Sequence, residues 1–279
     1  MLLADQCVPR LYPKSMRSAA FFDLDNTVIR GSSLFHFARR LVGQGFLNRR
    51  DLARFALREF KYVWSKTESK STTRFVSDRA LNIVAGYSAT EMEFLCDRVV
   101  LDFLDQVLIP ESVERIKRHQ KEGQSTWLVT ASPIEMALPI ANKLGMSGAL
   151  ATLPEVRDGV YTGFLQGGLM RGPMKAEAIR RLAERENFDL DASYAYSDSI
   201  NDLPMLAMVG KASVVNANKE LKRIALKNNW GVITTNSYDP SHSLPSMLTD
   251  VLSHEAHPWT RSSIKANSDY LGVQQSKHY

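Results

Sequence analysis

Two carboxylates follow directly on an apolar run near the start of the chain, within residues 19–29. Asp23 and Asp25 are spaced i, i+2, which places them on one face of an extended strand, and Asn26 and Thr27 then predict a turn. Mg²⁺ is commonly held by one or two carboxylates together with water and substrate phosphate. A carboxylate can also attack phosphorus to give an aspartyl-phosphate. The pair therefore favours phosphoryl chemistry divided between a nucleophile and a proton carrier, with an ordinary strand and turn as the alternative.

A second acidic cluster follows a later apolar run, residues 193–197. It places Asp198 and Asp202 around a predicted turn, with Asn201 between them. Asp198 adds a third carboxylate to the first pair. Together with Asp23 and one main-chain carbonyl it predicts an Mg²⁺ site that leaves room for water and substrate.

Two further polar residues lie where helices are predicted to begin. Thr130 ends a strand-like run beside a helix start, a geometry suited to holding a phosphate oxygen. In the same segment Ser132 and Glu135, with Pro133 between them, fit a capping box. Lys175 opens the next predicted helix, where the positive end of the helix dipole disfavours a cation. We therefore expect a bound phosphate or the Asp cluster to compensate Lys175.

The elements that must position these residues alternate between strand and helix. Apolar strand-like runs recur at residues 19–24, 125–130, 193–197, 212–215 and 231–234. Helical patterns separate the later runs, which predicts an α/β fold with a parallel sheet and an active site at the carboxyl ends of its strands. The segment 149–165 contains Asp158 and Gly159, a strong turn signal, and predicts a small β-hairpin beside the core.

An insertion of about 80 residues, 31–110, separates the first two strands, and its apolar residues recur at helical spacing. We interpret it as a helical cap on a discontinuous core made of residues 17–30 and 111–253. Between residues 31 and 80 there are 11 basic and 4 acidic side chains, although the whole chain carries a net charge of only +5. This surface is either a set of solvated helix faces or an anion-attracting region. The polar ends, 1–16 and 254–279, are expected to be flexible tails.

The composition is that of a protein with a full hydrophobic core, since 44% of the 279 residues are hydrophobic. Cys7 and Cys96 form no metal or disulfide framework, and the apolar surroundings of Cys96 predict a buried reduced thiol. The sequence shows no basic region ahead of an apolar leader and no run approaching the ~20 apolar residues of a membrane span. We therefore expect a cytoplasmic protein.

The ordered set of motifs resembles a known enzyme group. The motifs are Asp23-x-Asp25-x-Thr27, Thr130, Lys175 and Asp198-x-x-Asn201-Asp202. They resemble the four motifs of the haloacid dehalogenase superfamily over roughly residues 17–250. The insertion after the first motif resembles the cap of subfamily IB, the phosphoserine-phosphatase-like branch. The resemblance implies a Rossmann-like parallel core with a helical cap inserted after the first strand.

The resemblance also implies a role for each motif residue. Asp23 would attack phosphorus and bind Mg²⁺. Asp25 would protonate the leaving alcohol, then deprotonate the hydrolytic water, and its main-chain carbonyl would bind the metal. Thr130 and Lys175 would hold the phosphoryl oxygens, the electrostatic contribution that dominates phosphoryl transfer. A carboxylate at position 25 favours phosphatase or phosphomutase chemistry over the transport ATPases and dehalogenases of the superfamily.

The second acidic cluster has implied roles as well. Asp198 would bind the metal directly, and Asp202 would act on it through a water or orient Lys175. Asn201 would reach the phosphate. A glycosyltransferase Asp-x-Asp site is the alternative chemistry, but it leaves Thr130 and Lys175 unexplained.

The substrate is less closely defined. Phosphoserine phosphatases commonly carry an acidic residue nine positions after the nucleophile to grip the substrate amine, and this substrate-facing position is Ser32 here. The insertion has basic and aromatic residues interleaved at Arg49, Arg50, Arg54, Arg58, Phe46, Phe55, Phe60, Tyr62 and Trp64. They suit an anionic substrate with an apolar portion or a peripheral contact with a membrane surface. Equally, they form an amphipathic helix that packs on its neighbours.

The sequence therefore predicts a Mg²⁺-dependent phosphomonoester hydrolase. It would act through an aspartyl-phosphate on a small phosphorylated metabolite or a lysophospholipid-like ester. Phosphoserine phosphatase proper is one alternative, and a phosphatase-inactive, phosphotransferase or binding protein on the same fold is another. No specific nucleic-acid partner is expected, because the aromatic residues recur at helical spacing instead of forming a stacking surface. The oligomeric state is not predicted.

Overall fold

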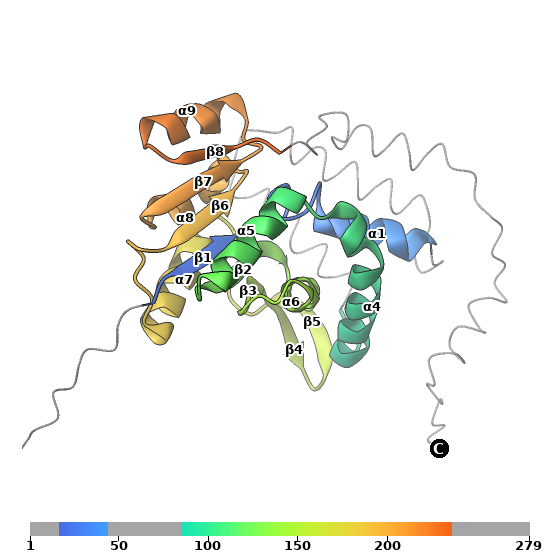
Figure 1. Ribbon diagram of the computed structural model, residues 1–279. Helices are drawn as coiled ribbons and strands as arrows, with labels where there is room; N and C mark the ends of the chain where they lie inside the picture. Colours follow the sequence, from blue (N-terminus) through green and yellow to red (C-terminus); the bar gives the residue numbers. More distant parts are fainter. Residues whose placement is uncertain (1–16, 44–84, 236–279) are drawn as a thin grey trace, which may run out of the picture.

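A six-stranded parallel sheet forms the centre of the protein (Figure 1). The structure is a computed structural model that describes residues 17–43 and 85–235. The strands lie in the order β3-β2-β1-β6-β7-β8. Their bounds are β1 Ala19–Phe22, β2 Ser125–Pro133, β3 Gly148–Thr152, β6 Tyr194–Ser197, β7 Lys211–Val215 and β8 Gly231–Ile233. All five predicted strand runs enter this sheet, so the predicted α/β parallel architecture is confirmed.

Helices cover both faces of the sheet. Their bounds are α1 Ser33–Gly43, α4 Ala89–Val107, α5 Pro110–Lys121, α6 Ile134–Lys143, α7 Pro173–Glu186, α8 Leu203–Ala207 and α9 Lys219–Lys227, with a 3₁₀ turn at Ile200–Asp202. On β1, Ala20 and Phe22 pack with α4, α5 and α6 on one face. Ala19 and Phe21 pack with α7, α8 and α9 on the other. Burial on both faces explains why this strand is an unbroken apolar run instead of an alternating one.

The central position of β1 brings three strand ends together. Phe22 pairs with Leu128 of β2 on one side and with Tyr196 of β6 on the other. Because all three strands are parallel, their carboxyl ends lie at the same edge of the sheet. The residues that follow β1 and β6, and the last residues of β2, are therefore neighbours in space.

The insertion between β1 and β2 is described at its two ends. Helix α1 lies beside α4, which α5 and β2 follow (Figure 1). Cys96 on α4 is a buried free cysteine, as predicted. Residues 44–84, which include the basic and aromatic positions of the expected cap, lie outside the described residues, as do Cys7 and both expected tails. The cap limits of 31–110 stay a prediction.

The predicted hairpin is present, but it is shorter than the segment assigned to it. Strands β4, Pro154–Arg157, and β5, Val160–Leu165, are antiparallel. Asp158 and Gly159 join them with positive φ angles of 51° and 78°.

The start of the segment assigned to the hairpin instead forms β3, the edge strand beside β2. Gly148 permits this pairing, since a Cβ there would lie 2.6 Å from the Trp127 ring.

None of the helices in the described part of the chain is both long and apolar enough to span a bilayer.

Candidate active site

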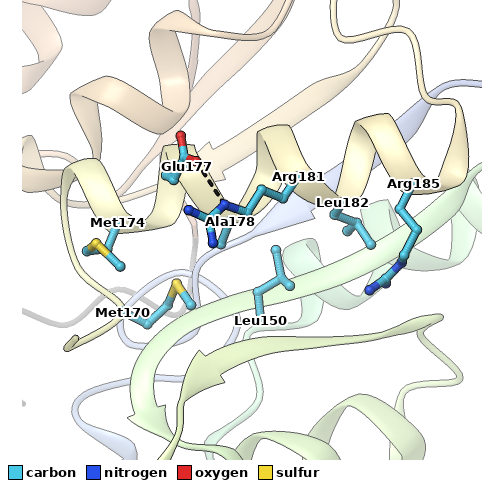
Figure 2. Close-up of a pocket in the computed structure, with 8 residues that line it drawn as sticks. All are labelled: Leu150, Met170, Met174, Glu177, Ala178, Arg181, Leu182 and Arg185. Carbon is cyan, nitrogen blue, oxygen red and sulfur yellow. Dashed lines mark hydrogen bonds and ion pairs between the residues drawn. The ribbon is translucent and has the colours of Figure 1, made fainter. Parts of the chain in front are cut away.

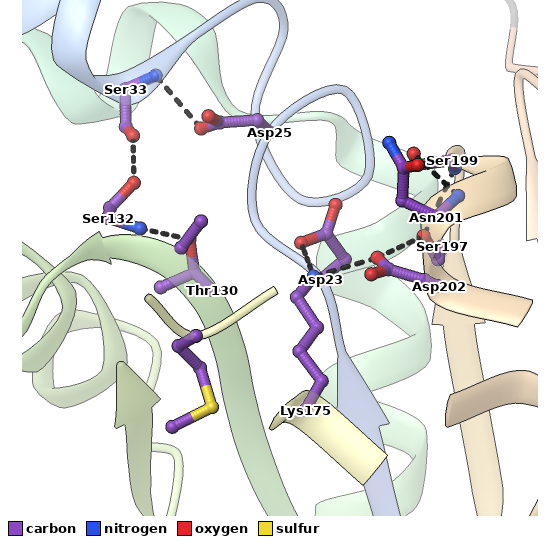
Figure 3. Close-up of polar contacts among 12 residues, drawn as sticks. Asp23, Asp25, Ser33, Thr130, Ser132, Lys175, Ser197, Ser199, Asn201 and Asp202 are labelled. Carbon is purple, nitrogen blue, oxygen red and sulfur yellow. Dashed lines mark hydrogen bonds and ion pairs between the residues drawn. The ribbon is translucent and has the colours of Figure 1, made fainter. Parts of the chain in front are cut away.

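The predicted site residues lie at the carboxyl ends of three adjacent strands. Asp23 follows β1, Thr130 lies near the end of β2, and Asp198 follows β6. Lys175 comes from the first turn of α7. Figure 3 shows Asp23 and Lys175 in the middle, with Thr130 on one side and Asp202 on the other. The strand order therefore assembles the motifs that the sequence keeps far apart.

A buried ion-pair network forms the centre of the site. Lys175 Nζ lies 2.6 Å from Asp23 Oδ1 and 2.7 Å from Asp202 Oδ2. Ser197 donates a further hydrogen bond of 2.7 Å to the same Asp202 oxygen. The expectation that the Asp cluster compensates Lys175 is confirmed. Asp202 contacts the ammonium group directly, the geometry expected of a residue that orients Lys175.

The helical periodicity of α7 places Lys175 on the buried face of the helix, which directs it into the site. Lys175 shares the buried face of the helix with Ala176, Ile179, Leu182 and Ala183. Packing of this face on the sheet fixes the helix, and its first turn then directs the lysine at the end of β1. Burial lowers the pKa of Lys175, but the two carboxylates outweigh that effect and raise the pKa overall.

Burial raises the pKa values of two carboxylates in the site. Burial raises the pKa of Asp23 to about 7, against the lowering effect of the Lys175 ammonium. Burial, reinforced by the charges of Asp23 and Asp202, holds the pKa of Asp198 well above its usual range. Asp23, Asp198 and Asp202 thus act on one another electrostatically around a single buried lysine. Such an excess of negative charge is stabilised by protons or by a bound cation.

Oxygen donors of this kind fit Mg²⁺. Asp23 and Asp198 would supply carboxylate oxygens, and the main-chain carbonyl of Asp25 would be the third protein ligand. Among the described residues, no three carboxylate, imidazole or thiolate side chains converge into a ready-made metal site. Main-chain, water and substrate oxygens would therefore have to complete the coordination, which is the usual pattern for Mg²⁺.

Asp25 points away from this centre, towards helix α1 (Figure 3). Its Oδ1 accepts a hydrogen bond of 2.9 Å from the main-chain N–H of Ser33. Burial raises the pKa of Asp25, and hydrogen bonds from Ser33 oppose the rise. The turn that follows uses Asn26 at φ 55°, and its side chain accepts a hydrogen bond from the Gly31 N–H.

Thr130 is buried, and its hydroxyl oxygen accepts a hydrogen bond of 3.1 Å from the Ser132 N–H. The predicted capping box at Ser132 is wrong. Strand β2 stays extended through Pro133, and α6 begins at Ile134 without a side-chain cap. The Ser132 hydroxyl is instead 2.6 Å from that of Ser33. Glu135 accepts a hydrogen bond from the Tyr161 hydroxyl.

The remaining predicted residues lie at the edges of the site. Asn201 is in the 3₁₀ turn, and its N–H donates to the Ser199 hydroxyl. Ser32 directly precedes α1, and its hydroxyl accepts a long hydrogen bond of 3.4 Å from the Phe35 N–H. Thr27 is fully buried after the Asp23-x-Asp25 turn, and its hydroxyl has no hydrogen-bond partner among the described residues.

Sequence reasoning missed three serines of this region. Ser197 ends β6 and supports Asp202, Ser33 holds Asp25, and Ser132 pairs with Ser33. A local signal exists for Ser197 alone, because it directly precedes the acidic cluster at a strand end. The other two contact each other across 99 positions of sequence, and no local pattern reports that contact.

A second concave region lies along α7 (Figure 2). It is a cavity of about 260 Å³. Its described lining consists of Leu150, Met170, Met174, Glu177, Ala178, Arg181, Leu182 and Arg185. No predicted site residue is among these, so the chemistry is assigned to the strand ends and not to this cavity.

Comparison with known proteins decides the family. The sequence pattern of haloacid dehalogenase-like hydrolases matches residues 20–207, from β1 to α8. The chain belongs to this family. The match spans the strands that carry Asp23, Thr130 and Asp198, and the protein is a hydrolase of the phosphatase type.

Individual relatives and a solved structure resemble this chain over most of its length. Phosphoserine phosphatase SerB1 of Mycobacterium tuberculosis is 36% identical over 220 residues, which cover 79% of this chain and 71% of the relative. The inhibition of morphological differentiation protein of Streptomyces azureus is 34% identical over 218 residues, covering 78% of each chain. A crystal structure of a protein of unknown function from Bordetella pertussis superposes with a TM-score of 0.68 at 27% identity. It covers 78% of this chain and 99% of its own.

Proposed function

We propose that this chain is a Mg²⁺-dependent phosphomonoester hydrolase that works through an aspartyl-phosphate on Asp23. The contact of 2.6 Å between Lys175 and Asp23, in a buried site at the end of β1, carries the proposal. It holds a carboxylate beside a cation where a phosphoryl group would gain negative charge in the transition state. Asp25 lies two residues further on, and its carboxylate accepts a hydrogen bond from the Ser33 N–H at the start of α1.

In the first step, an oxygen of Asp23 attacks phosphorus and the bond from phosphorus to the leaving oxygen breaks. Lys175 contacts Oδ1, and we assign the attack to Oδ2. Asp25 gives its proton to the leaving oxygen, so that an alcohol departs instead of an alkoxide. The raised pKa of Asp25, caused by burial, favours the protonated form that this step needs.

In the second step, the ionised Asp25 takes a proton from a water molecule that attacks the phosphorus of the aspartyl-phosphate. The bond from phosphorus to Asp23 breaks, which regenerates the carboxylate and releases phosphate. Lys175 and Thr130 hold the phosphoryl oxygens through both steps. Asp202 and Ser197 keep the Lys175 ammonium in position through their hydrogen bonds.

Mg²⁺, held by Asp23, Asp198 and the Asp25 carbonyl, would neutralise charge on the phosphoryl oxygens. Asn201, in the turn beside Asp198, is the further proposed phosphate contact. These assignments rest on the donor set at the strand ends and on the family to which the chain belongs.

We assign the substrate to small phosphorylated metabolites or lysophospholipid-like esters. Ser32 supports this, because its neutral hydroxyl gives no charge to pair with the amine of phosphoserine. The basic residues that would favour an anionic or membrane-surface substrate lie within 44–84, outside the described residues. We also propose that residues 31–110 form the cap and that residues 17–30 and 111–253 form the core. The free thiol of Cys96 supports a cytoplasmic location.

Phosphate release from a panel of esters tests the function. The panel holds phosphoserine, a sugar phosphate, glycerol phosphate and lysophosphatidate, each with and without Mg²⁺. Asp23→Asn is the inactive variant, and Asp105→Asn, at a 68% exposed carboxylate on α4, is the matched control. We expect Mg²⁺-dependent release that Asp23→Asn abolishes and Asp105→Asn retains. Absence of release from every ester by the folded protein would favour a phosphotransferase or binding role.

A further inference from the structure

We propose that Ser33 and Ser132 form a positioning pair that holds Asp25 at its working distance from the phosphate-binding residue Thr130. The inference rests on the proposed function, because it needs Asp25 to act as the acid of the first step. Nothing in the motifs assigns a role to either serine. Both belong to elements that the sheet and the insertion bring together.

The two hydroxyl groups form a short and fully enclosed contact. Their oxygens are 2.6 Å apart, and the exposed fractions of Ser33 and Ser132 are 0% and 2%. Ser33 is the first residue of α1, and Ser132 lies near the end of β2. A buried hydroxyl without a partner is costly, so these side chains constrain each other across the junction of helix and strand.

Each serine also holds one of the proposed site residues through its main chain. The Ser33 N–H donates to Asp25 Oδ1 at 2.9 Å, and the Ser132 N–H donates to Thr130 Oγ1 at 3.1 Å. The contacts run without a break from Asp25 through Ser33 and Ser132 to Thr130, as Figure 3 shows. The chain therefore joins the proposed acid to the proposed phosphate contact.

Either hydroxyl can be the donor in the contact between Ser33 and Ser132. Two hydroxyl groups bring two protons, and only one of them lies between the two oxygens. If Ser132 donates to Ser33, the Ser33 proton is free for the Asp25 carboxylate, which the Ser33 hydroxyl also contacts. Ser33 then donates twice to the ionised form of Asp25, the form that takes a proton from water in the second step, once from its N–H and once from its hydroxyl.

The pair matters because proton transfer depends steeply on position. A displacement of about 1 Å in a catalytic geometry can cost a factor of about 10² in rate. Loss of either hydroxyl frees the start of α1 relative to β2, and Asp25 moves with it. The cost should fall on both steps that use Asp25, and the first of them, protonation of the leaving oxygen, can be measured separately.

Leaving-group dependence separates this role from simple structural support. An alkyl ester such as glycerol phosphate needs a proton on its leaving oxygen, whereas p-nitrophenyl phosphate releases a stable phenolate without one. For Ser33→Ala and Ser132→Ala, we expect the rate of leaving-group release in a single turnover, which precedes the attack of water, to fall about tenfold or more with glycerol phosphate and less than about threefold with p-nitrophenyl phosphate.

Two further variants test whether a loss of rate comes from lost positioning of Asp25 or from lost stability. The double variant removes both hydroxyls and leaves no buried orphan, so it should recover much of the melting temperature lost by the single variants without recovering their alkyl-ester rate. Ser193→Ala is the matched control. Ser193 is also fully buried, but it hydrogen-bonds Ala19 and Asp189 at the opposite end of the strands.

The outcomes are distinct. A selective loss with glycerol phosphate in all three Ser33 and Ser132 variants, absent in Ser193→Ala, would support the positioning pair. Equal losses with both esters, or no loss, would overturn it while leaving the phosphatase intact. If the unmodified protein hydrolysed neither ester, the proposed function would fail, and the role of the pair with it.

Discussion

The ammonium group of Lys175 lies 2.6 Å from a carboxylate oxygen of Asp23, although 152 positions separate the two residues in the sequence. Both side chains are nearly inaccessible, with exposed fractions of 4% and 9%. Removing one member of such a pair leaves an uncompensated buried charge. Lys175 therefore stabilises the fold as well as the proposed chemistry.

Replacement of Lys175 tests both contributions. Lys175→Met should abolish turnover and lower the free energy of unfolding at pH 7 by about 3–5 kcal/mol, because Asp23 and Asp202 lose their shared cation. The loss should shrink as the pH falls, since the folded protein then binds a proton on Asp23 more readily than the unfolded chain does. Denaturant unfolding at several pH values measures it. An unchanged stability at pH 7 would contradict the ion-pair assignment, and Lys227→Met on α9 is the surface control.

Mg²⁺ should stabilise the folded protein through Asp198. A cation that binds the folded state alone adds about 2.7 kcal/mol at 100 times its dissociation constant. We expect a rise in melting temperature on adding Mg²⁺, and its loss in Asp198→Asn, because the carboxylate ligand is gone. Asp105→Asn should respond like the unmodified protein. An equal rise in both variants would place the cation elsewhere.

Asp25→Asn should separate the two chemical steps. With p-nitrophenyl phosphate, the variant should still transfer the phosphoryl group to Asp23 but lack the base that activates water, so that kcat falls by about 10²–10⁴-fold. We expect a burst of one p-nitrophenolate per protein molecule, and a protein mass increased by one phosphoryl group. Asp23→Asn should give no burst. A burst in Asp23→Asn would identify a different nucleophile.

His119 should make the fold sensitive to acid. Its imidazole is buried between Gln124 and the hydroxyl of Tyr196, and burial lowers its pKa from the ordinary value of 6.5. Below pH 6.5 the unfolded chain therefore binds a proton that the folded state resists, so stability falls as the pH is lowered.

The variant His119→Gln should lose less stability than the unmodified protein between pH 7 and pH 5. Parallel denaturant titrations measure the free energy of unfolding of both proteins at each pH. The active-site carboxylates and His36 contribute equally to both proteins, so their contributions cancel in the difference. Identical pH dependence in the two proteins would show that His119 does not carry this effect.

The sequence predicted the parts of the fold that depend on local patterns. The apolar run of β1 and the carboxylates that follow it identified a buried strand leading into a site, and the Asp158–Gly159 turn identified the hairpin. The edge strand β3 was not recognised, because its pairing depends on the close approach of Gly148 to Trp127. That contact crosses two segments and leaves no periodic signal in either.

The same distinction between local patterns and long-range contacts applies to the candidate site. Each motif residue lies at a strand end or a helix start that the adjacent residues in the sequence indicate. The link between Ser33 and Ser132 arises only when α1 meets β2, and a local pattern at Ser132 even favoured a different interaction, the capping box. Spacing in the sequence thus predicts which groups face the site and does not predict how those groups hold one another.

The place of β1 in the sheet has a consequence for biosynthesis. In the described chain it is the first strand to be made, yet its two neighbours begin only at Ser125 and Tyr194. Its apolar side chains therefore stay without their sheet partners while most of the chain is translated, a situation that favours slow folding and association with chaperones. The proposed nucleophile at its end would become competent only once β6 has docked, so an incomplete nascent chain would be protected from premature chemistry.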